Sequence, residues 1–377
     1  MAKHIKNQYL PDSVTTPGAT LQNTIEALGM SQADLADRTG RSKKMINEII
    51  KGKAPITPKM SIELERVLGT PASFWNNRER NYREGLARIE EQERLKKHIT
   101  WLASFPVNNM VKLGWIEKYN DKVQQLQELL KFFAIASPDQ WPRITSSLNE
   151  KVVFRKSTAF KTDNYALVAW LRSGEIEAGS IYCKPFNKEA FQSALQEIRS
   201  LTIEPPEVFQ EKIIEICSNC GVAVVFTPEL PKTRVSGATR WVSADKALLQ
   251  LSLRYKSDNH LWFSFFHEAG HIIKHGKKEI FIEGSSIDML ETKEEEADRF
   301  ASEFLISRAS YSQFIRDTAF SKAKIMNFAS SIGIAPGIVV GRLQHDKMLP
   351  VTHCNDLKKR FKWAFKKEKE NYGRFIN

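Results

Sequence analysis

The clearest periodic pattern in the chain lies between about residues 258 and 276. At 100° per residue, its apolar positions share one broad face: Trp262, Phe265, Phe266, Ala269, Ile272 and Ile273. The other side carries His267, Glu268 and His271. The pattern predicts a helix that buries one face in a core and turns a polar stripe toward a cleft. Gly270 leaves room beside that stripe for another element to approach closely.

A second amphipathic helix is predicted over residues 294–305. Its apolar face consists of Ala297, Phe300, Ala301, Phe304 and Leu305. Glu294 is the acid nearest that face, Asp298 lies one turn further on, Glu295 points away and Glu296 is at the margin. The apolar run 221–226 predicts a strand. Residues 247–253 predict another strand, which could be interior or could pair with a bound substrate strand.

Near the N-terminus, two short helices are predicted around a turn at Gly40. Ser31-Gln32-Ala33-Asp34 has the form of a capping box, and a second helix is expected from about Ser42 to Gly52. Ala36, Gly40 and Ile46 have the spacing of a helix-turn-helix, whose second helix enters the major groove of DNA. An ordinary pair of short core helices is the alternative. The expected DNA-contacting residues are Gln32, Ser42, Lys43, Lys44, Asn47, Lys51 and Lys53.

Composition agrees with a nucleic-acid partner. The 377 residues leave room for two or three domains, and the net charge of +12 suits a polyanion such as double-stranded DNA. No long apolar run or signal peptide is visible, so we expect a cytoplasmic protein that does not contact a membrane. Four cysteines argue against a disulfide framework, and we expect Cys217 and Cys220 to be two mostly buried thiols.

Residues 267–271 read His-Glu-Ala-Gly-His, which is an HExxH pattern. Two imidazoles four residues apart on a helix can bind one Zn²⁺ ion, and Glu268 can hold the attacking water and take its proton. We expect Glu294 to be the third ligand, with Glu296 the next candidate. Asp298 could fix the tautomer of a ligand imidazole. A surface helix that happens to carry two histidines is the alternative.

Other polar residues of this region have open roles. Arg240, Tyr255 and His260 are unranked candidates for stabilising an oxyanion. His275 lies two turns beyond His267, too far along the helix to share one ion with both histidines of the motif.

Two parts of the sequence resemble known protein families. His267-Glu268-Ala269-Gly270-His271, followed by Glu294-x-Glu296-Ala297-Asp298-x-Phe300-Ala301, resembles the ImmA/IrrE metallopeptidase domain over about residues 206–350. One departure is visible at Leu305-Ile306-Ser307, where the family usually has a Leu-Met-Pro-like helix stop. Residues 14–82 resemble the HigA antitoxin branch of the Xre/Cro DNA-binding domains. That resemblance implies five helices.

The predicted fold class is therefore α+β and mostly helical. We expect an Xre-type helix-turn-helix domain over residues 1–82 and a helical connecting domain over residues 83–204, rich in aromatic residues and without recognisable chemistry. A zincin-like peptidase domain with a small sheet is expected over residues 205–350, and a basic helix over residues 351–377.

The predicted function is a DNA-binding transcription regulator, antitoxin-like or phage-repressor-like, which carries a zinc-dependent endopeptidase. Its substrate would be a regulatory protein, such as a repressor or a toxin, and its DNA partner an operator bound by a homodimer. In the alternative, the zinc domain of a non-proteolytic antitoxin or stress sensor binds a ligand or a partner. The sequence leaves the operator, the substrate, the toxin and the inducing signal open.

Overall fold

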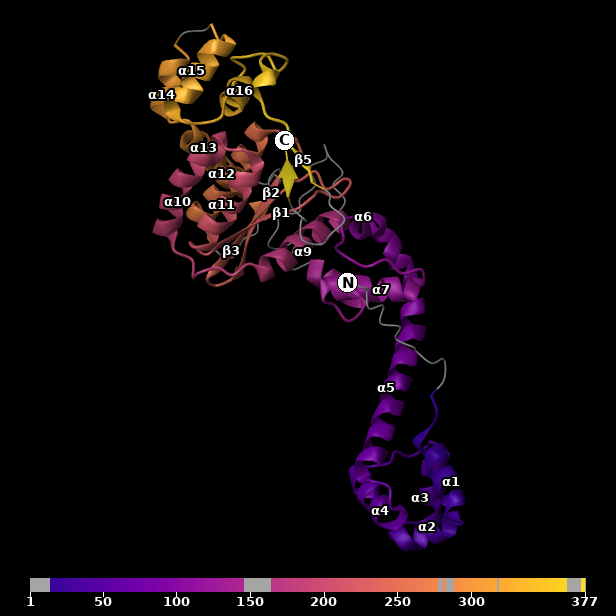
Figure 1. Ribbon diagram of the computed structural model, residues 1–377. Coiled ribbons are helices and arrows are strands. Elements are labelled where there is room, and N and C mark those ends of the chain that lie inside the picture. The colour runs from indigo at the N-terminus through magenta and orange to yellow at the C-terminus, as the bar shows by residue number, and fades with distance from the viewer. Residues whose placement is uncertain are drawn as a thin grey trace. The chain divides into compact units, whose positions relative to one another are not determined.

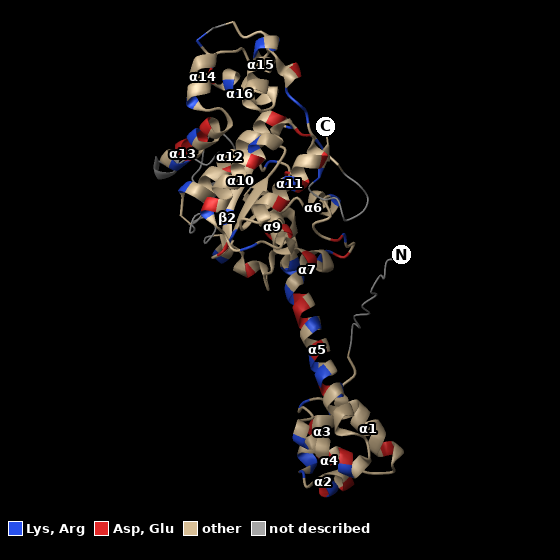
Figure 2. Cartoon of the chain, turned by 60° about the vertical axis from the view of Figure 1, so that its left-hand side comes forward, with Lys and Arg blue, Asp and Glu red and all other residues tan. Residues whose placement is uncertain are grey.

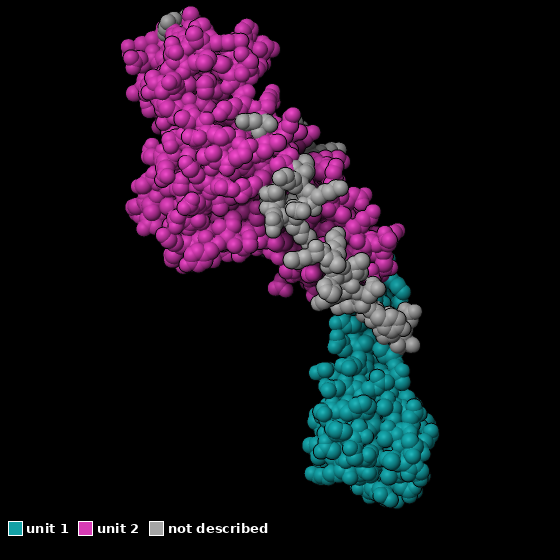
Figure 3. Space-filling view, viewed as in Figure 1, with its two compact units in different colours: residues 1–99 teal, residues 100–377 magenta. Residues whose placement is uncertain are grey.

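The structure, a computed structural model, describes residues 14–145, 164–276, 281–282, 288–316, 319–364 and 374–376. The chain divides into two compact units, residues 1–99 and residues 100–377 (Figure 3). In their described residues the units are mostly helical, with two small sheets in the second, which confirms the predicted α+β class.

Five α-helices make up the described part of the first unit: α1 (Pro17–Ala27), α2 (Gln32–Thr39), α3 (Lys43–Ile50), α4 (Pro58–Leu68) and α5 (Ala72–Lys96). The side chains of Thr16, Ser31, Ser42 and Thr57 cap the first four, each accepting a bond from a backbone N–H of the first turn. Gly40, at φ 67°, ends α2 in the left-handed conformation that glycine adopts without strain. These local signals were all readable in the sequence.

The core of the first unit lies between these helices. Its buried members include Leu21, Ile25, Leu35, Ala36, Ile46, Ile49, Met60, Leu64 and Trp75. Gly18 allows α1 to approach α3, because a Cβ at this position would lie 2.0 Å from the carbonyl oxygen of Ile49.

Helix α5 continues well past the predicted boundary at residue 82. It runs without interruption to Lys96, and basic residues are interspersed with Glu along it (Figure 2). Ion pairs at i,i+4 spacing, Arg83 with Glu79 and Arg88 with Glu84, support the helix there. Most of residues 83–98 therefore belongs to this helix, and the first unit extends to Ile99.

A four-stranded sheet in the order β1-β3-β2-β4 organises the second unit (Figure 1). Its strands are β1 (Val222–Phe226), β2 (Gly237–Ser243), β3 (Lys246–Leu251) and β4 (Phe281–Ile282). β1 and β3 are parallel, and β2 is antiparallel to both β3 and β4. β3 is interior, so the alternative in which this strand pairs with a substrate strand is wrong.

Helices cover both faces of this sheet. All five residues of β1 are buried, which requires apolar cover on either side. Val222 and Val224 pack in the core formed with α10 (Lys188–Ser200), α11 (Pro206–Ser218) and α12 (Asp258–Lys274). Ala223 and Val225 pack on the other side against α9 (Asn164–Ser180). Helices α9 and α10 therefore belong to the same unit as the sheet, whereas a boundary had been predicted at residue 204.

The remaining helices of the second unit form two further groups. Before α9 come η1 (Ile99–Ser104), α6 (Val107–Lys112), α7 (Lys122–Phe133) and η2 (Pro138–Gln140), which share an aromatic core. η3 (Leu201–Ile203) links α10 to α11. After β4 come α13 (Asp288–Leu305), α14 (Arg308–Phe314), α15 (Lys322–Ile332), α16 (Pro336–His345) and η4 (Asn355–Leu357).

The predicted basic helix at residues 351–377 is wrong for the part of this segment that is described. Residues 351–364 and 374–376 contain η4 and a two-stranded hairpin of β5 (Lys362–Trp363) and β6 (Phe375–Ile376). Phe361 and Phe375 are buried in the main core of the unit and contact Phe209 of α11. Phe361 and Trp363 alternate with Arg360 and Lys362, and the packing of the aromatic rings on distant parts of the chain accompanies the strand conformation.

Among the described residues, no single helix has the length and apolar composition to cross a membrane. The pair α15 and α16 passes that test only jointly, with a bend of 114° between the two helices.

Candidate metal centre and nucleic-acid interface

Helices α12 and α13 pack against each other and bring together the residues predicted to bind a metal. The contact is close at Gly270, where a Cβ would lie 3.3 Å from the Cα of Ala297 and 3.1 Å from Cδ1 of Phe300. This confirms the expectation that Gly270 makes room for a neighbouring element. The close packing sets Glu294 of α13 beside His267 and His271 of α12.

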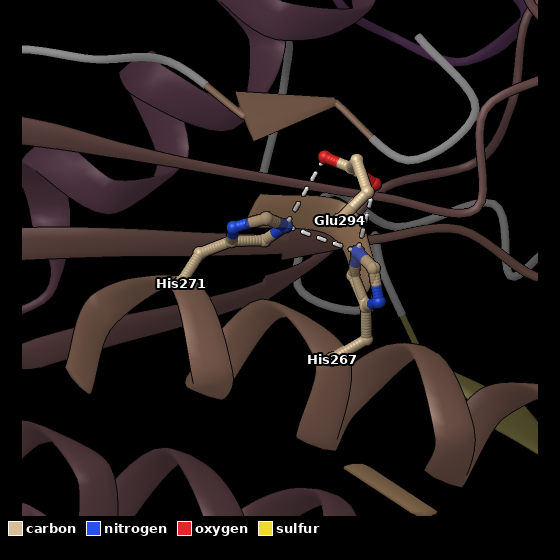
Figure 4. A group of neighbouring side chains, drawn as sticks. All are labelled: His267, His271 and Glu294. Atoms are coloured by element: carbon tan, nitrogen blue, oxygen red, sulfur yellow. Dashed lines mark hydrogen bonds and ion pairs between the residues drawn. The ribbon is translucent and has the colours of Figure 1, made fainter. Parts of the chain in front are cut away.

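The three side chains converge on one point (Figure 4). The Nε2 atoms of His267 and His271 are 3.0 Å apart. Oε2 of Glu294 lies 3.2 Å from Nε2 of His267, and Oε1 of Glu294 lies 3.4 Å from Nε2 of His271. Bonds of about 2.0–2.1 Å in a tetrahedral zinc site place ligand atoms roughly 3.3 Å apart. The two Nε2 atoms and the Glu294 carboxylate, here called the ligand triangle, are therefore spaced about as a zinc ion requires. Imidazole nitrogen and carboxylate oxygen are donors that zinc prefers.

The protonation states also suit a cation. Burial lowers the pKa of His271 to about 4, so its imidazole is neutral at pH 7. Burial by itself would raise the pKa of Glu294, but hydrogen bonding with His267 and His271 lowers it to about 2. Neutral imidazole and ionised carboxylate are the forms that bind metal.

Each histidine has a partner on its other ring nitrogen. Nδ1 of His267 is 2.8 Å from Oδ1 of Asp298, so an N–H donated there leaves the Nε2 lone pair facing the centre. This is the contact expected for Asp298. Nδ1 of His271 is 2.9 Å from Nδ1 of His275, whose Nε2 is 3.1 Å from Oε2 of Glu296.

The chain from His271 through His275 to Glu296 was missed by the sequence reasoning. His275 had been excluded as a ligand, correctly for distance, but its i+4 spacing from His271 was a signal for a supporting contact. Glu296, the second candidate for the third ligand, contacts His275 and lies outside the ligand triangle.

Both supporting contacts predict a graded loss of metal affinity. His275→Ala and Asp298→Ala should each weaken zinc binding by about 10–100-fold, because a ligand imidazole loses the group that orients it. Competition with a chromogenic chelator measures the dissociation constant. Exposed Glu303 on α13 supplies the control Glu303→Ala, which should bind as the wild type does. Unchanged affinity in both variants would show that these contacts do not support the centre.

Glu268 of α12 follows His267 directly and is fully buried. Its side chain packs against Gly237, the first residue of β2. A Cβ on Gly237 would lie 2.6 Å from its Oε1, so this carboxylate requires glycine in the strand. The hydroxyl of Thr239 donates to the backbone carbonyl of Glu268 at 3.2 Å. Strand β2 therefore packs directly on α12 at Glu268, with Gly237 against the carboxylate and Thr239 bonded to the backbone.

The three candidates for stabilising an oxyanion lie in two different places in the structure. Arg240 alternates with Thr239 along β2 and points to the opposite face, where it donates to the carbonyl of Leu171 in α9 at 2.5 Å. It therefore cannot reach the triangle. Tyr255 and His260 stack on each other at the N-terminal end of α12, with ring centroids 4.2 Å apart.

In the first unit, the second helix of the predicted motif presents its polar residues outward. Ser42 caps α3, and Lys43 and Lys44 are exposed in its first turn. Asn47 is half-buried one turn later, and exposed Lys51 and Lys53 follow the helix. Figure 2 shows basic residues on and around α3. Gln32, at the start of α2, is held by a 2.9 Å bond from its Nε2 to Gln22.

The chain carries the helix-turn-helix spacing a second time, which the sequence reasoning also missed. Ala329, Gly333 and Val339 repeat the intervals of Ala36, Gly40 and Ile46. Gly333 adopts φ 68°, and α15 and α16 meet at 114°, within the range of about 90–120° typical of the motif.

This second copy cannot present its second helix to DNA. Half of α16 is buried, and it packs on α12, where a Cβ on Gly337 would lie 2.5 Å from the carboxylate of Asp258. The α2–α3 pair is therefore the copy whose second helix is available for a groove.

The comparisons with known proteins find a match in each unit of the chain. Residues 21–75 match the helix-turn-helix family model, and residues 217–342 match the model of the IrrE N-terminal-like domain. No curated protein matches the sequence. The chain thus joins a helix-turn-helix DNA-binding domain to a peptidase-family domain, as the resemblances implied.

Solved structures similar to part of the chain include two antidote proteins. One is an addiction module antidote protein of the HigA family from Coxiella burnetii, at 25% identity over 22% of this chain and 91% of that chain, with a TM-score of 0.21. The other is a candidate antidote protein of a plasmid maintenance system from Nostoc punctiforme, at 25% identity and the same coverage, with a TM-score of 0.22.

Proposed function

We propose that the protein is a transcription regulator in which a zinc-dependent endopeptidase cleaves a regulatory protein. The observation that carries the peptidase half is the position of Glu268, buried beside a centre to which the described residues contribute three protein ligands. A structural zinc site is closed by four ligands and needs no general base, whereas a catalytic site keeps one position open. This arrangement matches the second kind.

The chemistry follows from the side chains present. His267, His271 and Glu294 would hold zinc, which when bound supplies a Lewis acid that polarises a carbonyl and lowers the pKa of water. The carboxylate of Glu268 accepts the proton of the attacking water and passes it to the leaving amine nitrogen. Asp298 and His275 keep the two imidazoles oriented throughout.

The DNA half rests on α3. Two copies of the first unit would read two half-sites about one helical turn apart, so we propose a homodimer on a short inverted repeat. Ser42, Lys43, Lys44 and Asn47 would face the groove, and Gln32, Lys51 and Lys53 would contact the phosphates.

Substitutions in α3 should separate specificity from affinity. Asn47→Ala should cost roughly 1–3 kcal/mol on the preferred site if Asn47 reads a base, with little change on random DNA. Lys51→Ala should weaken all sequences alike and reduce the salt dependence. Arg88→Ala, further along α5, is a matched control with no expected effect. Selection from random duplexes followed by salt titration provides the test, and the absence of any preferred site would argue against a specific regulator.

A cut in the chain's own segment from Arg83 to Lys97 would couple the two activities by separating the DNA-binding domain from the peptidase-family domain. In the structure most of that segment lies within α5, which must unwind before a peptidase can take it as an extended strand. A separate regulatory protein, a repressor or a toxin, is therefore the substrate class that we propose.

A second candidate function is supported by burial. His267, Glu268 and His271 are at most 1% exposed, which suits a centre that senses a ligand or a partner without proteolysis. In that case the chain is a DNA-binding antitoxin or sensor, and Glu268→Gln leaves its regulation unchanged.

A further inference from the structure

A basic patch lies at the N-terminal end of α12, about two turns before the ligand triangle. His260 precedes His267 by seven residues, so it shares the same face of α12 at a distance of about 10.5 Å along the axis. Ser264 lies between them on that face. The side chain of His260 is exposed.

The residues around His260 form a small pocket together with the start of β2. We call Arg254, Tyr255, Lys256, His260 and Arg360 the basic patch. The guanidinium of Arg254 lies 4.9 Å from the centroid of the Tyr255 ring, which stacks on His260. Arg360 donates to the carbonyl of Tyr255 at 3.4 Å.

The charge of the patch is one-sided. No acidic side chain lines the pocket among the described residues. Partial burial and the charges of Lys358, Arg360 and Arg254 lower the pKa of His260 to about 4, as expected in a positive field. The nearest acid along the helix, Asp258, is buried and faces the first turn of α16 instead.

We propose that the basic patch is a substrate subsite that selects an acidic side chain about three residues from the scissile bond. This rests on the proposed peptidase function. The spacing follows because an extended peptide rises about 3.3 Å per residue, so 10.5 Å corresponds to roughly three residues. Lys256 and Arg360 supply the attraction, and Tyr255 and His260 supply a flat surface for the aliphatic part of the acid.

A binding measurement tests the subsite without chemistry. The full-length, zinc-loaded Glu268→Gln variant is titrated against fluorescein-labelled peptides of alternating Glu and Ala, or of alternating Gln and Ala. Adding Lys256→Glu and Arg360→Glu should weaken binding of the Glu peptide by about tenfold, since each exposed charge pair contributes modestly. The control pair Lys188→Glu and Lys212→Glu makes the same charge change elsewhere on the second unit and should have less than about a twofold effect.

A cleavage measurement tests the subsite separately from the proposed peptidase function on which it rests. Wild-type protein is incubated with a peptide library, and the cut sites are read by mass spectrometry. Acidic residues enriched about three positions from the cut, and lost with Lys256→Glu and Arg360→Glu, support the subsite. Cutting without that enrichment overturns the subsite and leaves the proposed function standing. Charge-dependent binding without any cutting overturns the function and leaves the acidic-peptide site.

Two other results would overturn the proposal. One is equal loss of binding in the patch variant and in the control pair, or equal affinity for the Glu and Gln peptides. The other is a patch variant that loses affinity for duplex DNA and keeps its affinity for the Glu peptide, since the patch would then belong to a nucleic-acid interface.

Discussion

Purified protein is expected to contain about one zinc ion per chain, and His267→Ala, His271→Ala and Glu294→Ala are each expected to lose it. The loss should exceed the 10–100-fold expected for the supporting residues, because each substitution removes a ligand atom itself and not the group that orients it. Metal analysis after dialysis against a weak chelator measures it, with circular dichroism to show that the fold remains.

The chain offers a matched control one residue away. Glu295 is exposed on α13 and lies outside the ligand triangle, so Glu295→Ala should retain zinc at the wild-type level. If Glu294→Ala retains zinc equally well, the third ligand is some other residue, and the assignment of Glu294 is wrong.

Glu268→Gln is expected to keep zinc and DNA binding while lowering the rate of peptide cleavage by about 10²–10⁴-fold. The amide has nearly the same shape as the carboxylate and fits beside Gly237, but it cannot accept the proton of the attacking water. The peptide-library assay compares the variant with Glu295→Gln, for which no loss is expected.

The same variant distinguishes the two candidate functions in cells. If cleavage releases a promoter, a reporter under the control of the preferred DNA site should respond to DNA damage or phage challenge in the wild type and stay locked with Glu268→Gln. Identical responses, with no cleaved partner detected on a blot, would support the binding-only sensor. A Glu268→Gln protein as poor in zinc as the histidine variants would instead overturn the separation of base from ligands.

Features that depend on neighbours along one helix were predictable. His267, Glu268 and His271 lie on one face because positions i and i+4 coincide on any α-helix. The same reasoning selected Glu294 over Glu295 and Glu296, and the structure places Glu294 beside both histidines. The capping residues and turn glycines of the first unit were equally local.

Features that depend on distant segments were not predictable. The 83–204 region showed only helical patterns, and nothing in it revealed that α9 and α10 cover the two faces of a later sheet. Arg240 was one of three unranked candidates for stabilising an oxyanion, yet the alternation of β2 turns it to the opposite face. A shift of one position along a strand turns the side chain to the opposite face of the sheet. A residue assigned to the wrong face therefore lies entirely outside the site.

The two copies of the Ala-Gly-aliphatic spacing show where the boundary between sequence and tertiary structure lies. The sequence by itself determined that both segments form two helices around a left-handed glycine, since small-residue packing and a positive φ act within about ten residues. Only the tertiary structure decided that α3 keeps its polar face outward while α16 is packed on α12. The reason is that burial depends on which apolar faces meet, and that is a property of the whole core.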